Sequence, residues 1–165
     1  MHPSKVILGK RLLVVDDERD VLETLIELLR VCKVDPASSF DEAKKLLEEY
    51  EYDLVVLDIM GVKGFDLLEI ANKRDMPALM LTAHSLSVES LGRSMKEGAA
   101  YFVPKEKMAE IATYVADVLE AKESKKNPWT RWLDRMGRFF DATFTGPNWR
   151  EQQKEFLEKI KSQGI

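Results

Sequence analysis

The chain has 165 residues, a hydrophobic fraction of 45% and a formal net charge of −4. That length fits one globular domain with an extension, and the apolar content excludes a chain that is disordered throughout. A single cysteine, Cys32, excludes an internal disulfide and fits a reducing compartment. Because no apolar segment is long enough to span a bilayer, we expect a cytoplasmic protein.

The charge is distributed unevenly along the chain. Residues 1–121 carry 15 basic and 23 acidic side chains, whereas residues 122–165 carry 10 basic and 6 acidic ones. We therefore expect an acidic domain over 1–121, a polar linker over 122–128 that ends in proline, and a helical extension over 129–165.

Strand and helix patterns alternate through residue 121. The expected strands are Leu12–Val15, Val34–Ala37, Asp53–Asp58, Ala78–Thr82 and Tyr101–Val103. The expected helices contain Val21–Leu29, begin near Phe40 with Ser39 or Asp41 as cap, cover Phe65–Asn72 and Ser85–Lys96, and pass through Ile111–Leu119. Repeated β-α units with right-handed crossovers predict an α/β fold with a doubly wound, five-stranded parallel sheet.

Polar side chains stand where these strands end. Asp16 and Asp17 follow the first strand, Asp58 ends the third, Thr82 ends the fourth, and Lys105 follows the fifth. Carboxyl ends of parallel strands lie side by side and form the ligand crevice. Each acid could singly be a helix cap, and Thr82 an ordinary strand residue. Together the carboxylates, hydroxyl and ammonium indicate a site for a divalent cation and a phosphoryl group.

These residues carry a family resemblance over about residues 10–121. The run Leu13–Glu18, strand-terminal Asp58, the pair Thr82-Ala83 and Lys105 resemble the receiver domain of two-component response regulators, which has a flavodoxin-like fold. The resemblance implies that Asp58 accepts a phosphoryl group from a histidine kinase or a phosphotransfer protein.

The same resemblance implies a role for each neighbouring group. Asp16, Asp17 and Asp58 would hold Mg²⁺ together with the backbone carbonyl of Met60, since carboxylate and carbonyl oxygens suit this cation. Lys105 would neutralise the transferring group and Thr82 would donate its hydroxyl to a phosphoryl oxygen. The small Ala83 would leave the entry open.

Two further residues have open alternatives. Phe102 occupies the aromatic switch position of the family, but it equally fits a half-buried strand aromatic. His84 could modulate loss of the phosphoryl group, or it could be an exposed loop residue without a role. The loop Ile59–Phe65 is shorter than the family pattern and lacks its proline, and Pro104-Lys105 reverses the usual order of lysine and proline.

The extension contains an aromatic stripe at helical spacing. Its members are Trp129, Trp132, Met136, Phe139, Phe140 and Phe144. Gly146–Asn148 breaks this helix, and a second helix is expected around Trp149–Ile160. We expect the stripe to pack on the domain's own surface, on a downstream partner or on a second protomer. A DNA-binding or membrane-surface role is less favoured, because no helix-turn-helix pattern is present and acids interrupt the charged face.

Three functional classes follow. The favoured one is a phosphorylation-controlled signalling switch that acts through protein contacts and catalyses only its own aspartyl phosphorylation and dephosphorylation. One alternative is a receiver-like interaction module that is never phosphorylated. The other is a phosphatase of the haloacid dehalogenase type, which would carry a second acid where Met60 stands here.

Overall fold

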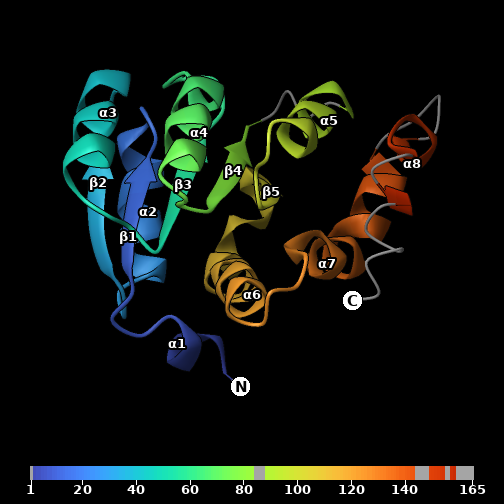
Figure 1. Cartoon of the computed structure of the whole chain (residues 1–165), viewed down its shortest axis with the longest axis horizontal. Coiled ribbons are helices and arrows are strands. Elements are labelled where there is room, and N and C mark those ends of the chain that lie inside the picture. The colour runs from blue at the N-terminus through green and yellow to red at the C-terminus, as the bar shows by residue number, and fades with distance from the viewer. Residues whose placement is uncertain (1, 84–87, 144–148, 155–156, 159–165) are drawn as a thin grey trace.

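One parallel sheet forms the centre of the molecule. The computed structural model describes residues 2–83, 88–143, 149–154 and 157–158. The strands are β1 (Arg11–Val15), β2 (Lys33–Ala37), β3 (Leu54–Asp58), β4 (Ala78–Thr82) and β5 (Tyr101–Pro104). They lie in the order β2-β1-β3-β4-β5, all parallel (Figure 1). The predicted doubly wound, five-stranded sheet is confirmed.

Helices cover both faces of the sheet (Figure 1). Helix α2 (Arg19–Leu28) contacts α6 (Ile111–Glu123) on one face, and α3 (Phe40–Glu49) contacts α4 (Gly64–Lys73) on the other. The remaining elements are α1 (Pro3–Val6), α5 (Val88–Lys96), the 3₁₀ helix η1 (Lys105–Glu110), α7 (Pro128–Thr143) and α8 (Trp149–Gln152). The sequence patterns predicted neither α1, which packs on α6, nor η1.

The strand sequences explain which strands are central. In β3 and β4 every residue is buried, and in β1 only Arg11 is partly exposed, as expected for strands covered on both faces. In strand β2 only Ala37 is buried, and Pro36 lies opposite Val14. Proline lacks an amide donor and is tolerated at a sheet edge, which is where β2 lies.

Helix α3 has a defined start. Of the two cap candidates, Ser39 is the cap, because its hydroxyl accepts the amide hydrogen of Glu42. The Glu42 carboxylate in turn accepts the amide hydrogen of Ser38 at 2.9 Å. Reciprocal bonds of this kind satisfy amide donors that a helix start leaves without partners.

The connection between α6 and α7 is short. Helix α6 continues through Glu123 and α7 begins at Pro128, so only residues 124–127 separate them. The Asn127 side chain accepts the amide hydrogen of Trp129 at 3.0 Å, and Pro128 supplies the backbone angle that a first helical residue needs. The chain therefore turns immediately from one helix into the next.

Helix α7 lies against β5 and α6 (Figure 1). Four of its stripe residues join the same buried hydrophobic cluster as the sheet, namely Trp129, Trp132, Met136 and Phe140. Phe139 is half-buried. Phe144, the predicted break at 146–148, Phe156 and Ile160 lie outside the described residues. The stripe is thus covered by the domain's own surface.

Candidate functional site

Asp58 stands at the carboxyl end of β3, where the sequence placed it. Its side chain is buried and its Oδ2 accepts the amide hydrogen of Gly61 at 3.1 Å. Asp58 pairs in register with Leu81 of β4, so Thr82 lies one residue further along the neighbouring strand. The carboxylate therefore points into the crevice formed by the strand ends.

Lys105 brings together the acids that follow β1 and the acid that ends β3. Its ammonium Nζ lies 2.9 Å from Asp16 Oδ2, 2.9 Å from Glu18 Oε1 and 3.5 Å from Asp58 Oδ1. The lysine side chain is only 15% exposed, so these contacts are shielded from water. The structure therefore gathers Asp16, Asp58 and Lys105 into one ionic cluster.

The adjacent acids Asp16 and Asp17 differ in burial. Asp16 is fully buried and its Oδ1 accepts the amide hydrogen of Glu18 at 2.9 Å, whereas Asp17 is exposed. Asp16, Asp17 and Glu18 can each place one carboxylate oxygen within 4.8 Å of the others. Hard oxygen donors at this spacing fit a divalent cation such as Mg²⁺.

The electrostatics of the cluster favour a bound cation. Burial, followed by the charge of Asp16, raises the pKa of Asp58, and Lys105 opposes that rise. Burial likewise raises the pKa of Asp16. Burial alone would lower the pKa of Lys105, but its hydrogen bonds to Glu18 and Asp16 outweigh burial and raise it. A single ammonium thus faces several carboxylates, and a divalent cation would offset the remaining repulsion.

Two glycines shape the loop after Asp58. A Cβ at Gly61 would lie 2.2 Å from Asp17 Oδ1, so the loop approaches that carboxylate closely only because residue 61 has no side chain. A Cβ at Gly64 would lie 2.3 Å from the Asp58 carbonyl oxygen and 2.8 Å from Ile59 Cα. The sequence patterns gave neither glycine a role, although glycines in a short loop after an acid indicate that the backbone approaches another group closely.

The other predicted residues are placed as follows. Thr82 is buried and Ala83 is half-buried at the end of β4. The Met60 side chain is 75% exposed in the loop after Asp58. His84 lies outside the described residues. Glu18, to which the sequence patterns gave no role, binds Lys105; its signal was its position directly after the acidic pair.

Phe102 is fully buried in β5, in register with Met80. Its ring centroid lies 5.8 Å from that of Phe140 in α7, and its carbonyl oxygen accepts the indole hydrogen of Trp132 at 2.8 Å. The aromatic at the predicted switch position therefore contacts the C-terminal extension directly.

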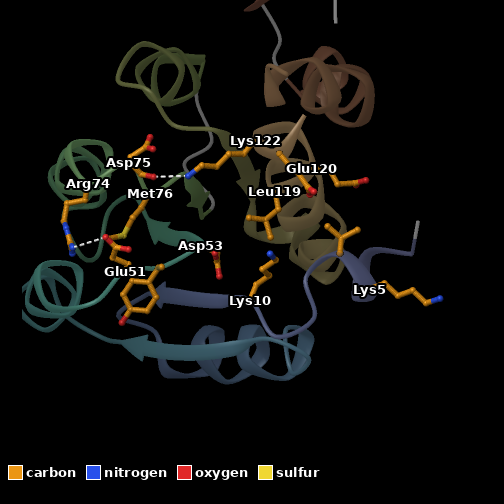
Figure 2. A pocket seen from close by; sticks show the side chains of 13 residues that line it. Lys5, Lys10, Glu51, Asp53, Arg74, Asp75, Met76, Leu119, Glu120 and Lys122 are labelled. Carbon is orange, nitrogen blue, oxygen red and sulfur yellow. Dashed lines mark hydrogen bonds and ion pairs between the residues drawn. The ribbon is translucent and has the colours of Figure 1, made fainter. Parts of the chain in front are cut away.

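A separate cleft lies at the amino ends of the strands. It encloses about 990 Å³ and its charged lining includes Lys10, Glu51, Arg74, Asp75 and Lys122 (Figure 2). Much of this charge is satisfied within the protein, since Lys122 Nζ donates to the Asp75 carbonyl at 3.0 Å and Arg74 lies 3.9 Å from Glu51. This cleft is at the opposite end of the sheet from Asp58.

The arrangement matches a known family. The model of the response regulator receiver domain matches residues 12–116. The chain belongs to this family. Receiver domains are the signalling domains of two-component response regulators, and membership of this family is consistent with phosphorylation-dependent signalling.

Curated relatives and solved structures agree with this assignment. The receiver is 36% identical over 108 residues to the two-component response regulator ARR18 of Arabidopsis thaliana, covering 62% of this chain and 17% of that protein. It is 40% identical over 76 residues to the heme response regulator HssR of Staphylococcus aureus, covering 43% of this chain and 34% of that protein. The matched part of the chain therefore spans 17% and 34% of the length of these two relatives.

Among solved structures, a response regulator receiver domain protein from Clostridium thermocellum is 28% identical, with a TM-score of 0.61, covering 69% of this chain and 97% of that one. A CheY-like receiver domain protein from Methanospirillum hungatei has a TM-score of 0.65 at 24% identity, covering 71% of this chain and 98% of that one, and supports the fold. Across the described ranges, no helix has both the length and the apolar character needed to traverse a bilayer.

Proposed function

We propose that Asp58 accepts a phosphoryl group from a phosphohistidine on a histidine kinase or a phosphotransfer protein. The observation that supports this most is the cluster in which Lys105 bridges Asp16 and Asp58 at 2.9 and 3.5 Å. Family membership supports the kind of donor. The single cysteine fits a reducing cytoplasm, where we place the reaction.

In the transfer step, an oxygen of the Asp58 carboxylate attacks phosphorus. The new P–O bond forms as the P–N bond to the histidine breaks, and the imidazole leaves with that electron pair. Lys105 would neutralise charge on the phosphoryl oxygens, and the Thr82 hydroxyl would donate a hydrogen bond to one of them. In a separate hydrolytic step, water attacks the phosphorus of the acyl phosphate, and the bond between phosphorus and the Asp58 oxygen breaks. This step restores the carboxylate and releases inorganic phosphate.

The residues also fit a resident divalent cation. Asp16, Asp17, Asp58 and the Met60 carbonyl would hold Mg²⁺, with Asp17 as a direct ligand because its carboxylate is exposed beside the loop at Gly61. When bound, Mg²⁺ supplies positive charge that stabilises the transferring phosphoryl group. The small side chain of Ala83 would leave room for the donor histidine.

The test is phosphorylation of the whole chain with a small phosphodonor, such as acetyl phosphate, in the presence of Mg²⁺. Intact-protein mass spectrometry should show one added phosphoryl group that is stable in acid and lost in base. Asp58→Asn should prevent the gain, while Asp53→Asn, which changes the acid directly before β3, should not. Labelling of Asp58→Asn at the wild-type level would place the phosphoacceptor elsewhere.

A further inference from the structure

Helix α7 is hydrogen-bonded to β5 and to the residues before it, and β5 leads directly to Lys105 of the phosphoryl site. Trp129 Nε1 donates to the Ala99 carbonyl and Trp132 Nε1 to the Phe102 carbonyl, both at 2.8 Å. Both indoles are buried. Buried hydrogen bonds that lose their partner leave a costly unsatisfied group, so the position of α7 depends on the position of β5.

Phe102 connects α7 to the face of the sheet that carries Thr82. In the register of the two strands, Thr82 lies opposite Pro104 and Met80 lies opposite Phe102. Since alternate residues of a strand share a face, Thr82 and Phe102 occupy neighbouring positions on the same face of the sheet. The other side of the Phe102 ring meets Phe140 of α7, with ring centroids 5.8 Å apart.

The end of β5 is also connected to the acidic cluster. Lys105 directly follows Pro104, and its ammonium is divided between Asp16, Glu18 and Asp58. The shortest of these contacts, at 2.9 Å, are with Asp16 and Glu18 rather than with Asp58. A phosphoryl group on Asp58 would draw the ammonium away from Glu18, and the chain leading back to Phe102 would move with it.

A second set of contacts holds α7 to α6. Asp117 of α6 is buried, and its carboxylate accepts hydrogen bonds from Arg131 at 3.1 Å, from Arg135 at 3.0 Å and from the Tyr101 hydroxyl at 2.9 Å. Tyr101 belongs to β5. We call these bonds of Asp117 with Tyr101, Arg131 and Arg135 the clamp. Because the clamp joins α6, α7 and β5, a displacement of β5 would change the contacts of α7 with both β5 and α6.

We propose that α7 is an intramolecular output element whose docking on β5 opposes phosphorylation of Asp58. Movement of Thr82 toward the phosphoryl oxygens opens space beside Phe102, and a close-packed interior fills such a space. The Phe102 ring moves toward Thr82 and away from Phe140, which loosens α7 and exposes its aromatic face. This proposal rests on Asp58 being the phosphoacceptor.

The coupling must act in both directions. If a phosphoryl group weakens the docking of α7, weaker docking must favour the phosphorylated form by the same factor. Couplings between sites in proteins are commonly about fivefold or larger. Beryllofluoride, which imitates the phosphoryl group on a carboxylate, allows both directions to be measured at equilibrium.

The first measurement uses the unaltered chain. Hydrogen exchange of the amides in 128–143 is compared with and without beryllofluoride and Mg²⁺, with Asp58→Asn as the control that cannot bind the anion. We expect exchange in this segment to become about fivefold faster in the wild type and to stay unchanged in Asp58→Asn. Unchanged or slower exchange in a wild type that binds the anion would overturn the proposal.

The second measurement uses variants of α7. Trp132→Phe removes the indole donor to Phe102 together with part of the buried ring, and Phe140→Leu removes the facing ring while keeping an apolar side chain. The matched control is Asp134→Ala, on the exposed face of the same helix. Fluorine NMR of the bound anion gives the affinity without relying on tryptophan emission.

We expect both variants to bind beryllofluoride about fivefold more tightly than wild type, with Asp134→Ala unchanged. Equal or weaker binding by both would overturn the proposed antagonism. Suppose that the wild type binds beryllofluoride and Asp58→Asn does not, but that neither the exchange in 128–143 nor the affinity of the α7 variants changes. That result would refute the role of α7 and leave the phosphoacceptor assignment intact. A wild type that binds none would refute both.

Discussion

The acidic cluster depends on a residue that has no side chain. Gly61 lets the loop after β3 lie against Asp17, since an added Cβ would be 2.2 Å from its carboxylate oxygen. Gly61→Ala should push that carboxylate out of place and weaken Mg²⁺ binding about tenfold, a usual consequence of misplacing the support of a metal ligand. Isothermal titration calorimetry measures this affinity directly.

The control for this substitution comes from the same loop. Met60→Ala removes an exposed side chain but keeps the backbone carbonyl, so its Mg²⁺ affinity should match that of the wild type. If Gly61→Ala binds Mg²⁺ as tightly as Met60→Ala does, Asp17 is not a ligand of the cation.

Cys32 offers a pH-dependent observable far from the cluster. Burial raises the pKa of its thiol from 9.0 to about 11, and its Sγ donates to the Ile7 carbonyl at 3.4 Å. Iodoacetamide attacks the thiolate, so alkylation of the folded chain should stay slow at pH 9 and rise toward pH 11. An alkylation midpoint near pH 9 in the folded chain would show that the thiol is not shielded.

The same shift has a consequence for stability. The folded chain keeps its thiol proton between pH 9 and about pH 11, whereas the unfolded chain loses it. The stabilising contribution is therefore complete below pH 9 and is lost as the pH rises through that window. Cys32→Ala should remove this part of the decline in urea-unfolding free energy across the window.

At the scale of elements, Gly64 controls how α4 begins. A Cβ there would lie 2.3 Å from the Asp58 carbonyl oxygen, which belongs to the backbone and cannot swing away as a side chain could. Gly64→Ala should lower the free energy of unfolding by about 2 kcal/mol through overpacking. Urea denaturation gives this difference.

Another helical glycine provides the comparison. At Gly92 an added methyl group would meet only the end of the Gln153 side chain, which can move. Gly92→Ala should therefore be neutral or stabilising, because alanine favours a helix more than glycine does. Equal losses at both positions would refute the distinction between backbone and side-chain obstruction.

The clamp on α7 predicts an asymmetry between its members. Asp117→Ala leaves the buried Tyr101 hydroxyl without its acceptor and removes the acceptor that Arg131 and Arg135 share, although Arg131 keeps its bond to Glu120. We therefore expect a loss of about 3 kcal/mol, typical of breaking a buried ion pair. Arg131→Ala should cost under about 1 kcal/mol, because Arg131 is 48% exposed and Arg135 keeps its bonds to Asp117. Thermal and urea unfolding distinguish these outcomes; equal losses would contradict the argument.

Sequence patterns predicted some of these elements better than others. The central strands were visible because their burial on both faces requires unbroken apolar runs, and their polar ends located Asp16, Asp58 and Lys105. The place where α7 docks was not predictable, because an aromatic stripe shows that a face is buried but not what covers it. Asp117 carried no signal at all, since its arginine partners come from α7 and its tyrosine partner from β5.

At the scale of the whole molecule, α7 shares its hydrophobic core with the sheet. Removing residues after Glu123 would uncover the surface on which Trp129, Trp132 and Phe140 are buried, each contributing on the order of 2–3 kcal/mol. We expect a chain ending at Glu123 to be several kcal/mol less stable and to associate through the newly exposed apolar surface. Urea unfolding and light scattering measure both effects.

A chain ending at Thr143 is the matched control, since it retains all of α7. It should keep the stability that α7 contributes and lose only the smaller contribution of the residues that follow, which include the buried Leu157. If the chain ending at Glu123 unfolds at the same urea concentration as the chain ending at Thr143 and stays monomeric, the contacts of α7 add nothing to the fold.

The two edges of the sheet limit how this receiver can be recognised. At one edge Pro36 leaves β2 without one backbone donor, and at the other the indoles of α7 already occupy two carbonyl oxygens of β5 and the residues before it. A partner that binds by adding its own strand needs a free row of such groups. Proteins that read this receiver with α7 docked must therefore recognise the side chains of its helices and loops.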